Sequence, residues 1–124
     1  MQKLEEKVLI ARWKSYMTFK HSGDVRRYTP YYYKEIHVMD DRTLTVREYN
    51  NDRPKTVLST NEWSLNFFNK KHYLDIAAYK LTFEIITVNH VVLVLLETVS
   101  GEKTFYAKEN TWNKYIQFNK EKTM

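Results

Sequence analysis

The hydrophobic pattern in the last third of the chain predicts three antiparallel strands in succession. Apolar and polar residues alternate from Tyr79 until Ile86 breaks the pattern, Val91–Leu96 is apolar throughout, and a third run spans Lys103–Ala107. Asn89-His90 and Ser100-Gly101 separate these runs, and Asn and Gly both tolerate the positive φ that a tight hairpin turn demands. The pattern therefore predicts a meander. Its middle strand is apolar on both faces, so we expect other parts of the chain to cover each side.

The N-terminal segment predicts a long first strand. Residues 2–7 are polar and fit one helical turn, whereas Val8–Phe19 alternates with a period of two. The face expected to reach the core carries Leu9, Ala11, Trp13, Ser15, Met17 and Phe19. Trp13 is the expected anchor of that face. Residues 21–30 contain turn-forming residues and end in a proline, so they predict a loop.

Four more strands are predicted between this loop and the meander. They comprise Tyr31–Met39, Arg42–Tyr49, a strand from Lys55 that is broken near Asn61 and resumes at Trp63, and Tyr73–Ala77. Turn signals separate them at Asp40-Asp41, Asn50–Pro54 and Asn69–Lys71. The residues expected on the inward faces of the third and fourth strands are Leu44, Val46, Trp63, Leu65 and Phe67. In the second strand, Tyr33, Glu35, His37 and Met39 share a face opposite Tyr32, Lys34, Ile36 and Val38.

The tail from Glu109 to Phe118 fits two patterns. Trp112, Tyr115 and Ile116 are spaced i, i+3, i+4, as on one face of a short helix. Alternation through Trp112, Lys114, Ile116 and Phe118 fits a strand less well. We therefore expect a short C-terminal helix.

About eight antiparallel strands joined by short turns predict an all-β sandwich or barrel. Few charges point inward along the strands and proline is almost absent, so open strand edges would have little protection. Closure removes such edges. We therefore expect one domain over residues 1–124, an antiparallel up-and-down eight-stranded barrel.

Composition narrows the class of protein. The 124 residues include 10 Tyr, only 2 Gly and 2 Pro, and no Cys, which excludes disulfides, thiolate zinc sites and a thiol nucleophile. The net charge of +5 is spread over both halves of the chain rather than gathered in a basic patch, so nucleic acid is not the expected partner. No apolar run is long enough for a transmembrane helix. Residues 1–6 lack an apolar signal core, so we expect a cytoplasmic protein, or a cell-envelope protein if a leader has been removed.

The strand pattern resembles a known family. Ala11-Arg12-Trp13 in the first strand is similar to the Gly-any-Trp signature of the lipocalins and their short bacterial lipocalin-like relatives, with Ala11 in place of the glycine. Ile36-His37-Val38 before the Asp-Asp turn, Glu62–Leu65 and Phe83–Ile86 resemble later strands of that family. The resemblance implies a calycin-type barrel, usually closed at one end, with a cavity for a small apolar ligand. It also implies that Trp13 packs at the barrel base.

Catalytic and metal-binding patterns are absent from the sequence. His21, His37, His72 and His90 fall on different predicted elements without the spacing of a metal site. Only Asp40 and Asp41 are adjacent carboxylates, and neighbours on a strand point to opposite faces. No phosphate-binding loop or dinucleotide fingerprint is present, so we expect no cofactor, no metal and no enzyme activity.

Inward alternation selects the candidate ligand-binding residues. The cavity candidates are Trp63, Phe67, Phe83 and Leu93, with Tyr33 and Arg27 as rim groups. Trp63, like Trp13, is compatible with lining a cavity or with plugging the closed end. An eight-stranded barrel has room for side chains alone or for one small ligand.

The pattern of residues is compatible with two functions. The first is non-catalytic binding of a small hydrophobic molecule inside the barrel. The alternative is a filled barrel that binds a protein partner through the aromatic and basic residues of Arg26–Lys34 and the tail around Trp112. Single-stranded nucleic acid is a third, less favoured partner for the same cluster.

Overall fold

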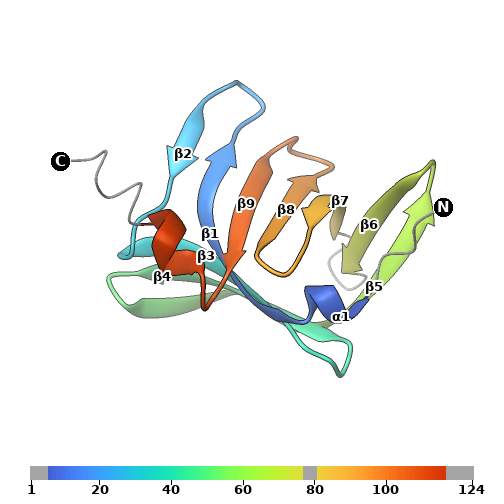
Figure 1. Ribbon diagram of the computed structural model, residues 1–124, viewed down its shortest axis with the longest axis horizontal. Coiled ribbons are helices and arrows are strands. Elements are labelled where there is room, and N and C mark those ends of the chain that lie inside the picture. The colour runs from blue at the N-terminus through green and yellow to red at the C-terminus, as the bar shows by residue number, and fades with distance from the viewer. Residues whose placement is uncertain (1–5, 77–80, 117–124) are drawn as a thin grey trace.

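A computed structural model describes residues 6–76 and 81–116, the side chains of residues 58 and 59 excepted. Its named elements are α1 (Glu6–Leu9), β1 (Ala11–Phe19), β2 (Val25–Arg27), β3 (Tyr32–Val38), β4 (Thr43–Asn50), β5 (Arg53–Phe68), β6 (Lys71–Ile76), β7 (Leu81–Val88), β8 (Val92–Glu97) and β9 (Lys103–Lys108). A short helix over residues 112–116 follows β9. Every strand pairing is antiparallel (Figure 1).

The sheet closes on itself through β1. Its first half pairs with β3 and its other edge pairs with β9, which joins the two ends of the strand order. The fold is thus the predicted eight-stranded barrel, formed by β1 and β3 to β9. Because successive strands run in opposite directions, the turns alternate between two ends. We call the end with α1 and the β3–β4, β5–β6 and β7–β8 turns the base, and the end with the β4–β5 and β8–β9 turns the mouth.

The first strand differs from the prediction at both of its ends. Leu9 belongs to α1, so the strand begins at Ala11 rather than Val8. A bulge between Ser15 and Met17 then reverses the alternation. Thr18 is consequently buried beside Thr104, and the prediction that Met17 and Phe19 share the core face with Trp13 is wrong.

The predicted loop at residues 21–30 contains a strand that the sequence did not reveal. β2 is only three exposed residues long and pairs with the end of β1 beyond β3. Its sequence, Val25-Arg26-Arg27, is too short to show a period. The strand predicted to break near Asn61 is instead continuous as β5, and its pairing with β4 shifts register near that position. One predicted strand ends at Ala77 and the next begins at Tyr79. Both of these positions lie outside the described residues.

The turns use the residues that the sequence indicated, in two different ways. Asn69 and Lys70 have positive φ values of 55° and 65° in the β5–β6 turn, and Gly101 has a φ of 75°. Asn89, in contrast, does not adopt positive φ. Its side-chain Oδ1 accepts hydrogen bonds from the backbone N–H groups of Val91 and Val92, both at 2.8 Å. This turn is stabilised by the Asn side chain and not by left-handed backbone.

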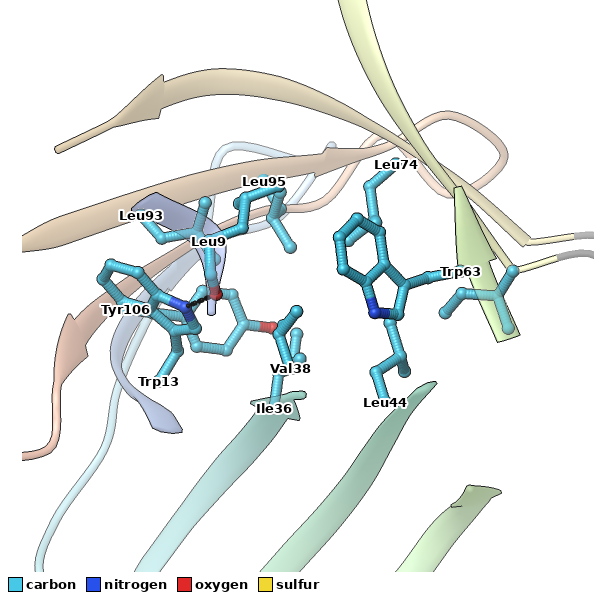
Figure 2. Packing of buried hydrophobic residues seen from close by; sticks show 11 residues of the cluster. Leu9, Trp13, Ile36, Val38, Leu44, Trp63, Leu74, Leu93, Leu95 and Tyr106 are labelled. Carbon is cyan, nitrogen blue, oxygen red and sulfur yellow. Dashed lines mark hydrogen bonds between the residues drawn. The ribbon is translucent and has the colours of Figure 1, made fainter. Parts of the chain in front are cut away.

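The main core fills the barrel from the base. Leu9, Trp13, Leu44 and Leu93 are fully buried in one cluster. Figure 2 shows Trp63 between Leu44 and Leu74, with Trp13, Tyr106 and the β8 leucines on the other side of the cluster. These side chains come from both walls of the barrel and hold it closed.

The C-terminal helix packs on the outer face of β1, as its predicted spacing requires. Trp112 and Ile116 are buried there, and the Tyr115 ring stacks on Tyr16 with centroids 4.7 Å apart. The Trp112 Nε1 donates a hydrogen bond of 2.9 Å to the Ser15 carbonyl. The prediction of a helix over this tail is therefore confirmed up to residue 116.

Candidate functional site

A cavity of about 160 Å³ lies inside the barrel toward the mouth. Its apolar wall comes from the inward positions of six strands, because alternate residues of each strand face the interior. The lining residues are Lys34, Ile36, Val46, Val57, Ile76, Leu81, Phe83, Leu95, Glu97, Glu102, Thr104 and Tyr106.

Three charged side chains, those of Lys34, Glu97 and Glu102, line this cavity. The alternation of β3 explains why Lys34 faces the interior. Lys34 is two residues from the buried Ile36 and faces the same side, as the sequence pattern predicted. Its backbone N–H donates to the Ser15 Oγ at 2.8 Å, which fixes β3 against β1 at this point. Glu97 and Glu102 lie at the β8–β9 end of the cavity. Among the described residues, Lys34 forms no ion pair within 4.0 Å.

Hydroxyl groups form a polar wall beside the cavity. The Thr18 Oγ1 lies 2.8 Å from the Thr104 Oγ1 and 2.9 Å from the Tyr28 hydroxyl. Burial raises the pKa of the Tyr106 hydroxyl, and the nearby Tyr28 raises it further. Tyr106 therefore keeps its proton across the ordinary pH range, and its hydroxyl is hydrogen-bonded to Thr104 at the edge of the cavity.

The predicted ligand-binding residues do not gather at one place. Phe83 lines the cavity. Trp63 and Leu93 are buried in the core, outside the cavity lining, and the Trp63 Nε1 donates to the Thr43 carbonyl at 3.1 Å. Phe67 lies near the tip of the β5–β6 hairpin, beyond the base, with 45% of its surface exposed. Strand alternation alone does not tell where along the barrel an inward residue lies.

The two predicted rim residues lie outside the barrel interior. Tyr33 is on the outer face of β3, where its ring packs on Trp112 and Tyr49 with centroids 4.5 Å and 4.8 Å apart. Arg27 is exposed on β2. The aromatic and basic residues of Arg26–Lys34 therefore do not form one rim, since Lys34 lines the cavity, Tyr28 is buried against Thr18, and Tyr33 and Arg27 lie outside the barrel.

Trp13 lies at the base of the barrel, next to α1. It is fully buried, and its Nε1 donates to the Leu9 carbonyl at 2.8 Å (Figure 2). This contact places α1 beneath the core.

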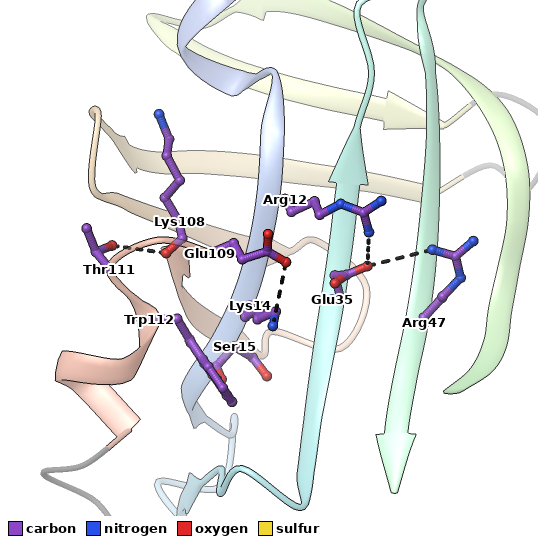
Figure 3. Close-up of polar contacts among 9 residues, drawn as sticks. All are labelled: Arg12, Lys14, Ser15, Glu35, Arg47, Lys108, Glu109, Thr111 and Trp112. Carbon is purple, nitrogen blue, oxygen red and sulfur yellow. Dashed lines mark hydrogen bonds and ion pairs between the residues drawn. The ribbon is translucent and has the colours of Figure 1, made fainter. Parts of the chain in front are cut away.

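A second polar cluster lies on the outer face of β1, β3 and β4 (Figure 3). The Glu35 Oε1 accepts from the Arg12 Nη1 at 3.2 Å and lies 3.7 Å from the Arg47 Nη1. The Glu35 side chain is only 3% exposed, so the two guanidinium groups neutralise a nearly buried carboxylate. Beside them, the Lys14 ammonium lies 3.6 Å from Glu109 and over the ring of Trp112.

Two pKa values on this face depart from their ordinary values. Desolvation lowers the pKa of His37, and the positive charge of Arg12 lowers it further. Desolvation and the neighbouring Tyr49 raise the pKa of Tyr33 to about 12. Both side chains are therefore uncharged at neutral pH.

Within residues 6–76 and 81–116, His, Asp and Glu side chains form no group of three or more that is placed to hold a metal ion. In the same ranges, no helix is long and apolar enough to cross a bilayer. No family model, curated protein or solved structure matches this chain.

Proposed function

We propose that the barrel binds one small, mostly apolar molecule in the cavity near its mouth, without catalysis. The observation that supports this proposal is the cavity itself, a partly open space of about 160 Å³ next to the packed core. Protein interiors are close-packed, and voids of this size are few in any domain. The resemblance to the lipocalin family supports the same role.

The cavity volume limits the size of the ligand. An apolar cavity of about 150 Å³ accepts a molecule the size of benzene. The proposed ligand is therefore close to that size, about six to nine non-hydrogen atoms, and smaller than the drug-sized ligands that fill pockets of roughly 300 Å³ or more.

The polar groups of the lining select the chemistry of the ligand. Lys34 supplies an ammonium donor, and Tyr106 supplies a hydroxyl that stays protonated. Glu97 and Glu102 in the same lining would repel a carboxylate. The best match is an uncharged molecule with an apolar body and one hydrogen-bond acceptor, such as a carbonyl oxygen.

Native mass spectrometry of freshly purified protein, before and after organic extraction, tests for a bound molecule directly. A small co-purifying mass that disappears on extraction supports the proposal. Isothermal titration calorimetry of the extracted protein with acetophenone tests whether the cavity prefers a ligand with a hydrogen-bond acceptor. Toluene, which has a similar apolar body but no acceptor, is the matched comparison ligand.

Two variants distinguish cavity binding from surface binding. Phe83→Trp adds volume in the cavity wall and should abolish binding of acetophenone, whereas Phe68→Trp at the exposed hairpin tip should leave it unchanged. Lys34→Met keeps an unbranched side chain of similar length but removes the ammonium donor. It should therefore weaken acetophenone binding and leave toluene binding nearly unchanged. Absence of any binding to the extracted protein, or equal loss in Phe68→Trp, would contradict the proposal.

A further inference from the structure

The tip of the β5–β6 hairpin exposes two adjacent aromatic residues. Phe67 is 45% exposed and Phe68 is 69% exposed, and Lys70 and Lys71 follow them across the turn. Buried aromatic side chains hold much of the rest of this fold together, so the exposure of a Phe-Phe pair is an exception.

The hairpin projects from the barrel wall. β5 and β6 pair as far as Phe68 and Lys71, but the pairing of β6 with β7 begins only at Tyr73. In the described part of the chain, residues at the tip therefore pair only with each other. This projection is visible at the right of Figure 1, where the ends of β5 and β6 extend away from the barrel. Lys71 and His72 are the two residues of β6 beyond this pairing, and two residues of strand correspond to about 7 Å.

The two phenylalanines point to opposite faces of the hairpin, because neighbours on a strand alternate. Phe67 is on the face of His72, with ring centroids 4.8 Å apart, and Phe68 is on the other face. A protein partner of standard size covers about 800 Å² on one side of a surface. The tip is narrow and has an aromatic ring on each face, so both rings are buried only if the binding partner surrounds the tip. The interfacial layer of a membrane can surround an inserted segment in this way.

The charge of the tip selects the kind of membrane. Residues 63–74 contain no acidic residue, whereas they contain Lys70, Lys71 and His72. Lys71 lies 3.6 Å from Glu84 of β7, and Lys70 at the turn forms no ion pair among the described residues. Long Lys side chains can keep their charge at the lipid headgroups while neighbouring rings enter the acyl boundary, and anionic headgroups attract them.

We propose that the β5–β6 hairpin tip inserts Phe67 and Phe68 into the interface of a membrane that contains anionic lipids. The insertion depth that the projection allows, about 7 Å, agrees with the depth at which interfacial apolar residues are buried. The tip belongs to the base end and lines no part of the cavity, so this inference is independent of the proposed ligand binding.

A tryptophan reporter at the tip tests the inference. The natural tryptophans Trp13, Trp63 and Trp112 are at most 6% exposed, so a Phe68→Trp variant adds one water-exposed fluorophore to a buried background. With vesicles of phosphatidylcholine and phosphatidylserine in equal parts, its emission should shift to shorter wavelength, and brominated acyl chains should quench it. Vesicles of phosphatidylcholine alone should produce a much smaller shift.

Matched variants test whether the hairpin tip is the part of the protein that binds the vesicles. Val99→Trp places the same fluorophore at the mouth, where Val99 is 85% exposed, and should show no shift. In the chain without reporters, Phe67→Ser and Phe68→Ser should each weaken sedimentation with anionic vesicles roughly tenfold, since each removes one buried ring. Lys70→Glu should weaken it as well and is the second test if a Phe variant does not fold by circular dichroism.

Three results would overturn the inference. One is sedimentation with anionic vesicles that neither the Phe nor the Lys70 variants weaken. Another is an equal shift of the Val99→Trp reporter. A third is self-association of the chain, seen by sedimentation velocity in the absence of vesicles and abolished by Phe68→Ser. That result would assign the tip to contact with a second copy of the chain.

Discussion

The indole Nε1 of Trp13 donates a 2.8 Å hydrogen bond to the backbone carbonyl of Leu9, and both residues are fully inaccessible to solvent. The bond joins the last residue of α1 to β1 across four positions of the chain. A helix as short as α1 is not stable by its own hydrogen bonds. The contact with Trp13 therefore holds α1 in place beneath the core and closes the base of the barrel.

Trp13→Phe should reduce the free energy of unfolding by about 2–4 kcal/mol. The change leaves the buried Leu9 carbonyl without its partner and creates a small cavity, and both effects destabilise. Urea unfolding followed by circular dichroism measures the difference. Phe68→Leu, at an exposed site, is the control and should change stability by less than about 0.5 kcal/mol. A Trp13→Phe protein as stable as the control would show that the bond contributes nothing to the fold.

The positive φ values of the two glycines predict that replacing either one by alanine destabilises the fold. The loss of stability should come from backbone strain and not from a clash of the new Cβ with its neighbours. Gly101 (φ 75°) and Gly23 (φ 96°) both have left-handed backbone, and a Cβ at Gly101 would lie 3.1 Å from the His21 Nδ1, whereas one at Gly23 meets nothing within 4 Å. His21 is exposed and free to move away. Gly101→Ala and Gly23→Ala should therefore destabilise equally, by about 1–2 kcal/mol in thermal or urea unfolding. Rescue of Gly101→Ala by His21→Ala would contradict this prediction.

Arg12 and Arg47 should act as substitutes for each other around Glu35. Both guanidinium groups approach the same oxygen of a carboxylate that is 3% exposed, so either one alone still neutralises it. Arg12→Gln and Arg47→Gln should each cost about 0.5–1 kcal/mol. The double variant should cost more than their sum by roughly 0.5–3 kcal/mol, because it leaves a buried charge unpaired. A double-mutant cycle in urea measures this coupling, and strict additivity would refute it.

Stability should fall as the pH decreases below about 6.5, in part through His37. Desolvation and Arg12 lower the pKa of His37 below its ordinary value of 6.5, so the unfolded chain binds this proton more readily than the folded protein does. The stabilisation is complete above the unfolded pKa and is lost as the pH falls toward the folded pKa. In urea unfolding at a series of pH values, His37→Gln should show a smaller decrease over this window, and Arg12→Gln a partial reduction. An unchanged pH dependence in His37→Gln would exclude the effect.

The alternation along β3 placed Lys34 and Ile36 on one face and Glu35 and His37 on the other, and the structure has the same arrangement. The pattern did not reveal that Lys34 would line a cavity, because it carries no information on depth along the barrel axis. Phe67 illustrates the same limit, since it shares a face with the buried Trp63 but lies beyond the base.

The sequence by itself determined the eight strands of the barrel, most of their turns, the C-terminal helix and the closed barrel, since these depend on the local period of apolar residues and on turn-forming side chains. Only the tertiary structure decided the bulge after Ser15, the pairing of β2 and the convergence of Arg12 and Arg47 on Glu35. It also decided the cavity and the projection of the β5–β6 tip. Each of these depends on the register between strands that are distant in the chain, and register is set by the packing of the whole barrel.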